Sequence, residues 1–428
     1  MAKLVKNISL SIIEGRTVRD LLYNDLLIHL NKKNIEPTIF SEASNIPEFT
    51  GQWNNQKAKF VDLEPSSTST NRSRAYWMRR RISKLKTTGI LEAYIHYENK
   101  FLYPPKKTYL DQFESDNCQL LVTTHAHLPN ERELISSADK LNIPTLGLIK
   151  SWDNVHKGIY SRPKSMAVWN KINKQELVDI EKYKPENIFV IGAPQFDSYF
   201  DKNIIWSKTE YLSKLGLNPN RPIIFYATIG DFGFNLDETY WLDFLLAEIK
   251  NGTIKNNPQI ICRLHPWSRY ERFKKYENIE GVKISYVKNY WPGLGWYMDN
   301  DEVTMMANMI NHSNIVISPG STVILEAAIF NRPTIFPIFN DIQKQRADQY
   351  FNTWVLGKHF ERIKNLDLVP IIDNSKLLAP AINKYMENPS WYEKQRSRLV
   401  SDYVCFTDGK STIRLANLIE KLSGIKIV

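Results

Sequence analysis

Residues 314–337 read NIVISPGSTVILEAAIFNRPTIFP and hold the clearest secondary-structure pattern of the chain. An apolar run at 315–317 stops at a small-residue loop, and an amphipathic segment at 323–330 follows the loop. A second apolar run at 334–336 begins after the helix-breaking residues NRP. Two apolar runs of strand length around one short amphipathic segment predict a strand–helix–strand unit with parallel strands.

The loop of this unit, SPGST at 318–322, has the composition of an anion-binding turn. It places backbone N–H groups and hydroxyls where a helix begins, and the helix dipole is positive at that end. A phosphate or pyrophosphate suits this geometry. One turn into the helix, Glu326 is placed to accept a hydrogen bond from a sugar hydroxyl. The alternative is a parallel-sheet crossover with an ordinary Ser/Thr helix cap and no ligand.

The chain has 428 residues, which exceeds one compact domain and fits two domains of about 200 residues each. With 43% hydrophobic and 24% charged residues, it has the composition of a globular protein. The net charge of +10 indicates a polyanionic partner. Because no nucleic-acid-binding motif is present, we expect a membrane surface or a phosphorylated substrate and no nucleic acid. Cys118, Cys262 and Cys405 are too far apart for a zinc site or disulfide framework, which fits a reducing cytosol.

The N-terminus lacks the apolar core of a signal peptide, and no apolar stretch reaches the roughly 18 residues of a membrane span. We therefore expect a cytoplasmic protein that is peripheral on the inner face of the plasma membrane. Residues 72–86 hold seven Arg and Lys side chains interleaved with apolar and aromatic ones. On a helix they predict a basic face with aromatic anchors for an anionic membrane surface. The alternative is a solvated surface helix.

Strand and helix patterns alternate along the chain, which predicts an α/β fold. We expect two Rossmann-like, doubly wound domains that face a central cleft. The first domain is expected at residues 1–202 and binds the acceptor, with a C-terminal helix at 395–428 packing back on it. The second is expected at 203–394 and binds the donor, and its first residues, 203–222, are expected to form a polar interdomain linker. A single amphipathic helix is expected at 18–31.

Polar residues of the first domain follow strands at their carboxyl ends, where open α/β sheets bind ligands. Arg16 is placed to meet an acceptor phosphate or carboxylate, although a solvated loop arginine is the alternative. The predicted acceptor-binding residues are Arg16, His125, His127, Trp152, Asp153 and Asn154.

In the second domain, three loops that each follow a parallel strand are expected to converge. They contribute an acid, an imidazole and the SPGST loop, which suits group transfer from a nucleotide-activated donor because the departing phosphate gains charge. Asp231 and His265 are the predicted catalytic residues; the alternatives are a turn-capping aspartate and a structural loop histidine. The predicted donor-binding residues are Gly230, Gly233, Arg263, Pro266, Ser318, Gly320, Ser321, Thr322 and Glu326.

Three motifs, DFG at 231–233, HP at 265–266 and SPGST at 318–322, carry a family resemblance. The chain resembles bacterial surface-polysaccharide glycosyltransferases of GT-B fold, in particular transferases of CMP-Kdo or sialic-acid type and CDP-glycerol glycerophosphotransferases. The stretches SWDNVHKG, AVWN and IGAPQFD are also similar to capsule-biosynthesis proteins. The resemblance implies that His265 and the SPGST loop bind the nucleotide phosphates. It implies that Asp231 is the general base of an inverting enzyme or the nucleophile of a retaining one.

The sequence leaves several functions open. The first is transfer of Kdo or another CMP-activated acidic sugar to a capsule, O-antigen or lipopolysaccharide acceptor, either a glycan or a lipid-linked glycan. The alternatives on the same fold are a CDP-glycerol-type glycerophosphotransferase, a UDP-sugar hexosyltransferase and a UDP-HexNAc 2-epimerase. A non-catalytic membrane- or glycan-binding subunit is the alternative outside enzymes. No D-x-D motif stands at a strand end, so we expect no metal and no cofactor beyond the nucleotide-sugar substrate.

Overall fold

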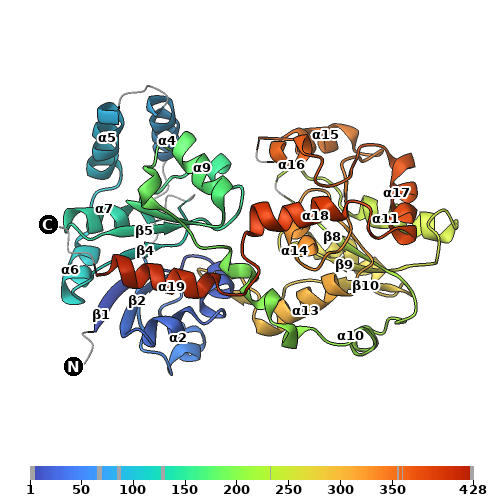
Figure 1. Cartoon of the computed structure of the whole chain (residues 1–428), viewed down its shortest axis with the longest axis horizontal. Helices are drawn as coiled ribbons and strands as arrows, with labels where there is room; N and C mark the ends of the chain where they lie inside the picture. Colours follow the sequence, from blue (N-terminus) through green and yellow to red (C-terminus); the bar gives the residue numbers. More distant parts are fainter. Residues whose placement is uncertain are drawn as a thin grey trace. The chain divides into compact units, whose positions relative to one another are not determined.

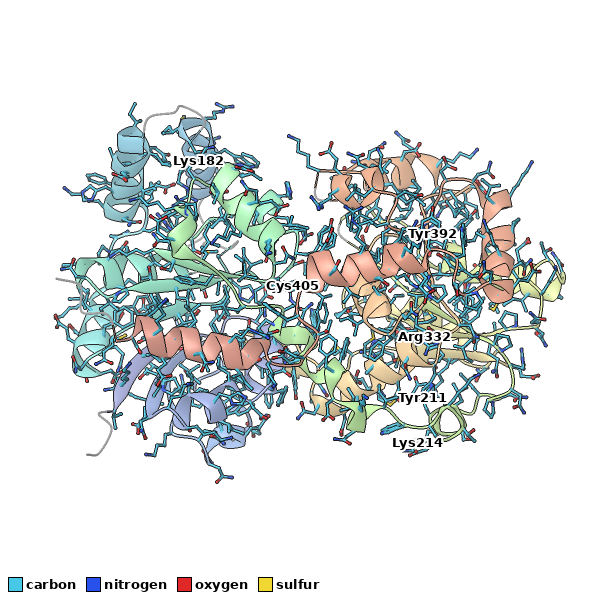
Figure 2. All side chains as sticks on the ribbon, in the orientation of Figure 1. Lys182, Tyr211, Lys214, Arg332, Tyr392 and Cys405 are labelled. Atoms are coloured by element: carbon cyan, nitrogen blue, oxygen red, sulfur yellow. The ribbon has the colours of Figure 1, made fainter. Side chains whose placement is uncertain are left out.

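The chain folds into two compact units, each built on its own parallel sheet (Figure 1). The first unit comprises Met1–Asp197, Asn289–Tyr297 and Cys405–Val428, and the second comprises Ser198–Lys288 and Met298–Val404. Cys405, labelled in Figure 2, is where the chain returns to the first unit. The computed structural model describes residues 5–64, 70–83, 88–126, 131–231, 233–353, 356–358 and 360–424.

The sheet of the first unit has seven strands in the order β3-β2-β1-β4-β5-β6-β7, all paired in parallel. The order switches direction between β1 and β4, and in doubly wound sheets ligands bind beyond the carboxyl ends of the strands at such a switch point. The strands are β1 (Lys6–Ser11), β2 (Ile35–Ser41), β3 (Lys59–Asp62), β4 (Leu121–Thr123), β5 (Thr145–Leu148), β6 (Ser165–Val168) and β7 (Ile188–Val190).

Two helices from opposite ends of the chain pack together on this sheet. Leu27 of α2, Leu415 of α19 and Leu10 of β1 are fully buried in one apolar core, and Figure 1 shows α19 running beside α2. The helices of the first unit are α1 (Gly15–Thr17), η1 (Val18–Leu22), α2 (Leu26–Asn31), α3 (Pro47–Thr50), α4 (Thr70–Ile82), α5 (Thr88–Tyr97), η3 (Glu98–Leu102), α6 (Lys107–Ser115), α7 (Arg132–Lys140), α8 (Asn154–Lys157), α9 (Lys171–Asp179) and α19 (Ser411–Leu422), with short 3₁₀ turns η2 (Gly51–Trp53), η5 (Pro185–Asn187) and η6 (Pro194–Phe200).

The sheet of the second unit has six parallel strands in the order β10-β9-β8-β13-β14-β15. Its switch point lies between β8 and β13, so the loop after β8 and the SPGST loop after β13 leave the sheet side by side. The predicted strand–helix–strand unit is confirmed as β13, α14 and β14. The strands are β8 (Ile223–Ala227), β9 (Gln259–Arg263), β10 (Val282–Ser285), β13 (Ile315–Ile317), β14 (Thr334–Pro337) and β15 (Ile371–Ile372).

Helices of the second unit connect its parallel strands, precede the first strand or follow the last. They are η7 (Lys202–Ile204), α10 (Lys208–Lys214), α11 (Thr239–Lys250), α12 (Tyr270–Phe273), η8 (Lys274–Tyr276), α13 (Asn300–Asn311), α14 (Val323–Ile329), α15 (Lys344–Thr353), α16 (Glu361–Asn365), α17 (Ser375–Glu387), α18 (Glu393–Leu399) and η9 (Val400–Val404).

The expected single helix at 18–31 is wrong. The structure has the π-helix η1 and then the separate helix α2, with Asp25 between them in a left-handed conformation at φ 62°. A left-handed residue cannot continue an α-helix, and aspartate is among the few residues that adopt this conformation readily. Apolar spacing alone does not reveal the break, because both pieces bury leucines on the same side.

The structure differs from the expected linker at 203–222 and from the expected boundary at residue 394. Residues 203–222 are fixed within the second unit: the Trp206 N–H donates to Asn308 Oδ1 at 2.9 Å, and Asn308 Nδ2 donates to the Ile204 carbonyl at 2.8 Å. They are therefore no free linker. Residues 395–404 also belong to the second unit, because α18 and η9 pack against α14.

A two-stranded hairpin from the middle of the chain belongs to the first unit, which the sequence did not predict. It consists of β11 (Tyr290–Trp291) and β12 (Gly295–Trp296). The Gly15 N–H donates to the Leu294 carbonyl at 2.7 Å, and any Cβ on Gly15 would collide with the Trp296 carbonyl. Glycine at position 15 is therefore required by this close backbone approach.

Candidate functional site

The imidazole of His265 is held in one tautomer by the loop after β9. Its Nδ1 accepts the Trp267 N–H at 3.2 Å, and its own backbone N–H donates to Thr228 Oγ1 at 2.7 Å. Because Nδ1 is an acceptor here, the neutral ring carries its proton on Nε2, which makes Nε2 a hydrogen-bond donor. A Cβ on Gly230 would lie 2.5 Å from Nδ1, and Gly230 has φ +87°. Gly230 thus lets the loop after β8 lie directly against this ring.

Glu238 ties the two loops together, and the sequence prediction missed it. It is the N-cap residue of α11 and is 4% exposed. Its Oε1 accepts the N–H groups of Ile229 at 2.5 Å and Gly230 at 2.8 Å, and its Oε2 accepts the Ser268 hydroxyl at 2.6 Å. Burial raises the pKa of Glu238, and these hydrogen bonds oppose the rise. An acid directly after the Gly-rich loop was the available signal.

Asp231 is engaged as a turn residue. Its Oδ1 accepts the N–H groups of Gly233 at 3.2 Å and Asn235 at 3.1 Å, and its Oδ2 pairs with Arg269 at 2.6 Å. Partial burial raises the pKa of Asp231, but the Asn235 hydrogen bond and the Arg269 charge outweigh it, so the pKa lies below its ordinary value. These contacts favour the turn-capping alternative, because a carboxylate with a lowered pKa is a poor proton acceptor.

The SPGST loop buries one hydroxyl and leaves others half-exposed. Ser318 is fully buried, and its Oγ has no hydrogen-bond partner within the described residues. Gly320 has φ +101°, and its N–H donates to the Ser318 carbonyl at 2.8 Å, which turns the chain sharply. Ser321 and Thr322 are half-buried. The helix α14 that follows has only seven residues, so the hydroxyls rather than a long helix dipole are the main feature of this loop.

Two other predicted donor-binding side chains have partners inside the second unit. Glu326 accepts the Tyr199 hydroxyl at 2.6 Å. Arg263 is 6% exposed and donates to Glu302 Oε2 and Ser285 Oγ, each at 2.7 Å. These contacts show Arg263 holding β10 and α13 to β9. Pro266 is half-buried beside His265.

The first unit carries a second polar cluster at the carboxyl ends of β1, β4 and β5. His125 is fully buried, its Nε2 lies 2.9 Å from Glu14 Oε2, and its Nδ1 lies 3.2 Å from Thr124 Oγ1. Burial lowers the pKa of His125 to about 4, so the ring is neutral at pH 7. Burial raises the pKa of Glu14, but the His125 hydrogen bond and nearby cations bring it well below its usual range. Lys150 is ion-paired with Asp20.

Glu14 and Lys150 were missed by the sequence prediction. Lys150 directly follows an apolar strand, so the rule that singled out Arg16 applies to it equally. Arg16 itself is exposed, donates to Glu14 from Nε at 2.8 Å, and has its guanidinium 5.9 Å from the Trp296 ring centroid. The geometry therefore joins Arg16, Glu14 and His125 into one chain of contacts.

The other predicted acceptor-binding residues have structural contacts. Asp153 accepts the Ser151 hydroxyl at 2.6 Å and pairs with Lys157 at 2.7 Å. Asn154 Oδ1 accepts the backbone N–H groups of Lys150 and Ser151 at 2.9 and 2.8 Å, which shapes the loop after β5. The Trp152 side chain is 4% exposed. His127 lies outside the described residues.

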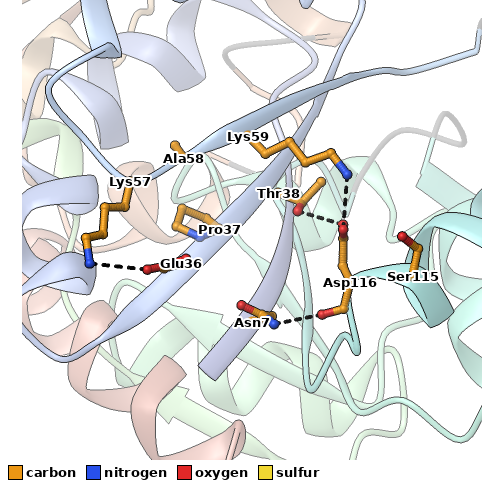
Figure 3. Close-up of a pocket in the computed structure, with 9 residues that line it drawn as sticks. All are labelled: Asn7, Glu36, Pro37, Thr38, Lys57, Ala58, Lys59, Ser115 and Asp116. Carbon is orange, nitrogen blue, oxygen red and sulfur yellow. Dashed lines mark hydrogen bonds and ion pairs between the residues drawn. The ribbon is translucent and has the colours of Figure 1, made fainter. Parts of the chain in front are cut away.

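A cavity of about 430 Å³ lies at the opposite, amino edge of the first sheet (Figure 3). Its charged side chains are paired with one another: Lys59 with Asp116 at 3.1 Å and Lys57 with Glu36 at 3.4 Å. Asp116 also accepts the Thr38 hydroxyl at 2.7 Å. Since open α/β sheets bind ligands at the carboxyl edge, we give this cavity no functional role.

In the described part of the chain, no group of three or more His, Cys, Asp or Glu side chains is arranged to hold a metal ion. No helix within the same residues is long and apolar enough to cross a membrane.

The fold is shared with known nucleotide-sugar enzymes. UDP-GlcNAc 2-epimerase from Neisseria meningitidis superposes with a TM-score of 0.57 at 11% identity, covering 97% of this chain and 100% of the epimerase. A glycosyltransferase from Rickettsia africae gives 0.54 at 13% identity, with 98% and 100% covered. The wall teichoic acid polymerase TagF gives 0.55 at 14% identity, with 98% and 89% covered. At such identities the similarity establishes the fold alone, and the two doubly wound units give the chain the GT-B fold.

The sequence family is narrower than the fold. The model of the family described as CDP-Glycerol:Poly(glycerophosphate) glycerophosphotransferase matches residues 151–421, which is more than half of the chain. The chain belongs to this family and is a transferase. No curated protein matches it significantly over its sequence.

Proposed function

We propose that this protein transfers a glycerol phosphate, or a closely related polyol phosphate, from a CDP-activated donor to a hydroxyl of a cell-surface polymer. The family match over residues 151–421 carries the proposal, because that range includes the whole loop system of the second unit. The finer expectation of a CMP-activated acidic sugar becomes the second candidate.

The reaction joins the acceptor oxygen to the β-phosphorus of the donor. The bond between that phosphorus and the oxygen bridging to CMP breaks, CMP leaves, and the hydroxyl proton passes to solvent or to a base. Protein assistance in phosphoryl transfer consists mainly of positioning and charge stabilisation. We assign this role to the Nε2–H donor of His265 and to the hydroxyls of Ser318, Ser321 and Thr322.

Asp231 has no part in this proposal as a base, since its carboxylate already accepts two N–H groups and pairs with Arg269. The acceptor is assigned to the first unit at Arg16, whose exposed guanidinium suits the phosphates of a growing polymer. The acceptor is a surface glycan or a lipid-linked glycan.

The test is release of CMP from a panel of donors, with CDP-glycerol, CMP-Kdo, CMP-sialic acid and UDP-GlcNAc each offered singly. We expect turnover with CDP-glycerol in the presence of a poly(glycerophosphate) acceptor. A thermal shift gives a binding readout without an acceptor, because a ligand at about 100 times its Kd adds roughly 2.7 kcal/mol of stability. Binding and turnover confined to CMP-Kdo or CMP-sialic acid would replace this proposal by the second candidate.

Transfer of a CMP-activated acidic sugar is favoured by the net charge of +10, which suits an anionic sugar as well as a polyanionic acceptor. A UDP-sugar hexosyltransferase or a UDP-HexNAc 2-epimerase shares the fold. A response to UDP-GlcNAc and to no cytidine nucleotide would select that reading.

A further inference from the structure

The helical hairpin α4–α5 of the first unit has an inner side anchored to the domain. Ala75 and Arg79 on α4, and Ser83 directly after the helix, are four residues apart and all buried. Arg79 Nη1 pairs with Glu98 Oε2 at 2.7 Å, and Arg132 Nη2 lies 3.3 Å from the same oxygen. This corrects the expectation of one continuous basic surface over 72–86, because Arg79 points inward as a buried anchor.

The outer side of the hairpin concentrates exposed apolar side chains. Among the described residues, eleven large hydrophobic side chains are exposed, and five of them lie on α4, α5 and η3. This cluster is far denser than the scattered single exposures that need no explanation. Its members are Trp77 (53% exposed), Met78 (46%), Ile90 (51%), Tyr97 (47%) and Phe101 (61%).

The spacing places these side chains in one stripe on α5 and η3. Ile90, Tyr97 and Phe101 are seven and four residues apart, which puts them on one helix face. The rings of Tyr97 and Phe101 lie 5.2 Å apart, and Tyr94 lies 5.9 Å from Tyr97. Figure 1 shows α4 and α5 projecting together from the first unit, away from its sheet.

Basic groups stand among these rings. The Arg80 guanidinium lies 5.8 Å from the Trp77 ring centroid, and Lys100 Nζ lies 5.3 Å from that of Phe101. Arg74 and Arg81 are also exposed on α4. Arg74, Arg80, Arg81 and Lys100 outnumber the one exposed acid of α5, Glu92, so this surface has a positive excess. The side chain of Arg72 and residues Lys84 and Lys86 lie outside the described part of the chain.

We propose that the outer side of the α4–α5 hairpin docks on an anionic lipid bilayer. Aromatic rings prefer the headgroup level of a membrane, and neighbouring arginines bind lipid phosphates. The combination of rings and cations favours a lipid surface over a protein partner, because the core of a protein interface is depleted of charged side chains. The surface is complementary in charge to anionic lipid whatever donor the enzyme uses.

The test is co-sedimentation of the full chain with vesicles of phosphatidylcholine alone and with mixed phosphatidylcholine–phosphatidylglycerol vesicles. We expect binding to the mixed vesicles that weakens as salt is added. The double variant Arg74→Glu/Arg81→Glu is expected to lower the partition coefficient by at least about fivefold for each arginine. The double variant Trp77→Ala/Phe101→Ala is expected to lower it comparably and with less salt dependence.

Matched controls come from the second unit. Ile342→Ala/Leu377→Ala removes side chains that are 82% and 52% exposed, and Lys250→Glu/Lys274→Glu reverses two exposed charges. Both control variants are expected to bind vesicles as the wild type does. Loss of binding in the controls as well as in the hairpin variants, or no preference for anionic vesicles, would overturn the proposal.

Two further readouts separate this proposal from other outcomes. Sedimentation velocity without lipid shows whether the hairpin variants change self-association, which would make the surface a protein interface and overturn the lipid assignment. The thermal shift with CDP-glycerol, measured without vesicles, reports on the second unit alone. A retained shift in a variant that has lost vesicle binding separates loss of docking from misfolding and from failure of the proposed donor.

Discussion

Two buried glutamates, Glu131 in the first unit and Glu238 in the second, each hold a loop in place by accepting its backbone N–H groups. Each is the N-cap residue of the helix that follows it, and neither side chain caps that helix. Each carboxylate instead accepts hydrogen bonds from one serine hydroxyl and from two consecutive backbone N–H groups. These N–H groups belong to the loop after β4 in the first unit and to the loop after β8 in the second, and both strands lie at the switch point of their sheet. The acceptors differ in detail: Glu131 takes the N–H groups of Thr124 and His125 on separate oxygens, and Glu238 takes both N–H groups on Oε1.

The difference lies in what each loop presents. In the first unit the captured residue is His125, which is fully buried and held neutral against Glu14. In the second unit the captured residue is Gly230, whose missing side chain makes room for the half-buried ring of His265. The same kind of carboxylate contact therefore accompanies a buried imidazole, His125, in the first unit and a half-buried one, His265, in the second. Because only His265 is accessible, our proposal assigns the substrate contact to that ring.

The largest effect should come from replacing the accessible imidazole. His265→Ala is expected to lower kcat by roughly 10² to 10⁴, the range found for groups that donate or accept protons in the transition state. The measurement is steady-state release of CMP from the donor that the enzyme uses. His265→Gln keeps a donor near Nε2 and is the matched control, with a smaller expected loss. Equal activity of His265→Ala and the wild type would place the catalytic donor elsewhere.

The buried imidazole should act on stability instead. Its pKa of about 4 lies below its unfolded value, so the unfolded chain binds the extra proton first. The free energy of unfolding is therefore expected to fall as pH drops from about 6.5 to 4, by about 3 kcal/mol from this group. His125→Gln, which cannot titrate, removes this slope.

Urea denaturation at several pH values checks the difference between His125→Gln and the wild type. The contribution of Glu14 has a separate window, because its pKa is lowered and its stability is lost only as pH falls below about 4.5. A difference between the two proteins that stays constant from pH 7 to 4 would show, through the same linkage, that the buried ring keeps its ordinary pKa.

The two glutamates should respond differently to the same amide substitution. In Glu131→Gln the new NH₂ group must face a backbone N–H in either orientation, because Thr124 and His125 donate to different oxygens. In Glu238→Gln the oxygen can keep both N–H groups while the NH₂ donates to Ser268 Oγ, which is able to accept. We expect Glu131→Gln to cost about 2 kcal/mol and Glu238→Gln less than about 1 kcal/mol.

Hydrogen exchange of the amides of β4 and β8, compared between the two variants, measures these costs unit by unit. This local readout is preferable to one global transition, because a two-domain chain need not unfold in a single step. Equal losses of protection in the two variants would contradict this prediction. They would mean that the distribution of the N–H groups over the two carboxylate oxygens does not determine the loss of stability.

Much of this fold was predictable, because the strands of parallel sheets are continuous apolar runs that local sequence reveals. The run at 315–317 was identified as a strand, and the SPGST loop follows it directly. The α4 anchor was not predictable, since Arg79 is buried only because Glu98, nineteen residues later, lies against it. A basic stretch gives no sign of which arginine turns inward.

The candidate site was predictable in its loops and less so in its roles. His265 and Gly230 were singled out, and the structure joins them through one close contact. Asp231 was predicted to be catalytic and Arg263 to bind the donor, from their positions at strand ends, but their partners Arg269 and Glu302 lie on other elements. The position of a residue relative to a strand end predicts where its backbone lies. It does not predict which side chain of another element it contacts.

The glycine contact supplies a smaller test. Gly230→Ala combines a backbone strain of about 1–2 kcal/mol at φ +87° with a Cβ 2.5 Å from His265 Nδ1. Gly216→Ala is the matched control, because Gly216 has φ +71° and open space around its missing Cβ. We expect a larger loss of thermal stability in Gly230→Ala than in Gly216→Ala, because only the first methyl collides with a side chain. We expect a loss of about tenfold in kcat for Gly230→Ala alone, since its methyl displaces the His265 ring. Equal kcat values for the two variants would show that the ring moves away without consequence.

The smallest effect is expected at Asp231, where sequence position and structure disagree most. In Asp231→Asn the amide oxygen still accepts the N–H groups of Gly233 and Asn235, and only the pairing with Arg269 is lost. Arg269 is 56% exposed, and such a pair contributes about 0.2–1 kcal/mol. We expect kcat in the CMP-release assay to change by less than about threefold, because 0.6 kcal/mol corresponds to roughly that factor. A loss as large as that of His265→Ala would instead mean that the carboxylate contacts the reacting groups. Asp231 would then be a base whose carboxylate leaves its turn contacts when substrate binds.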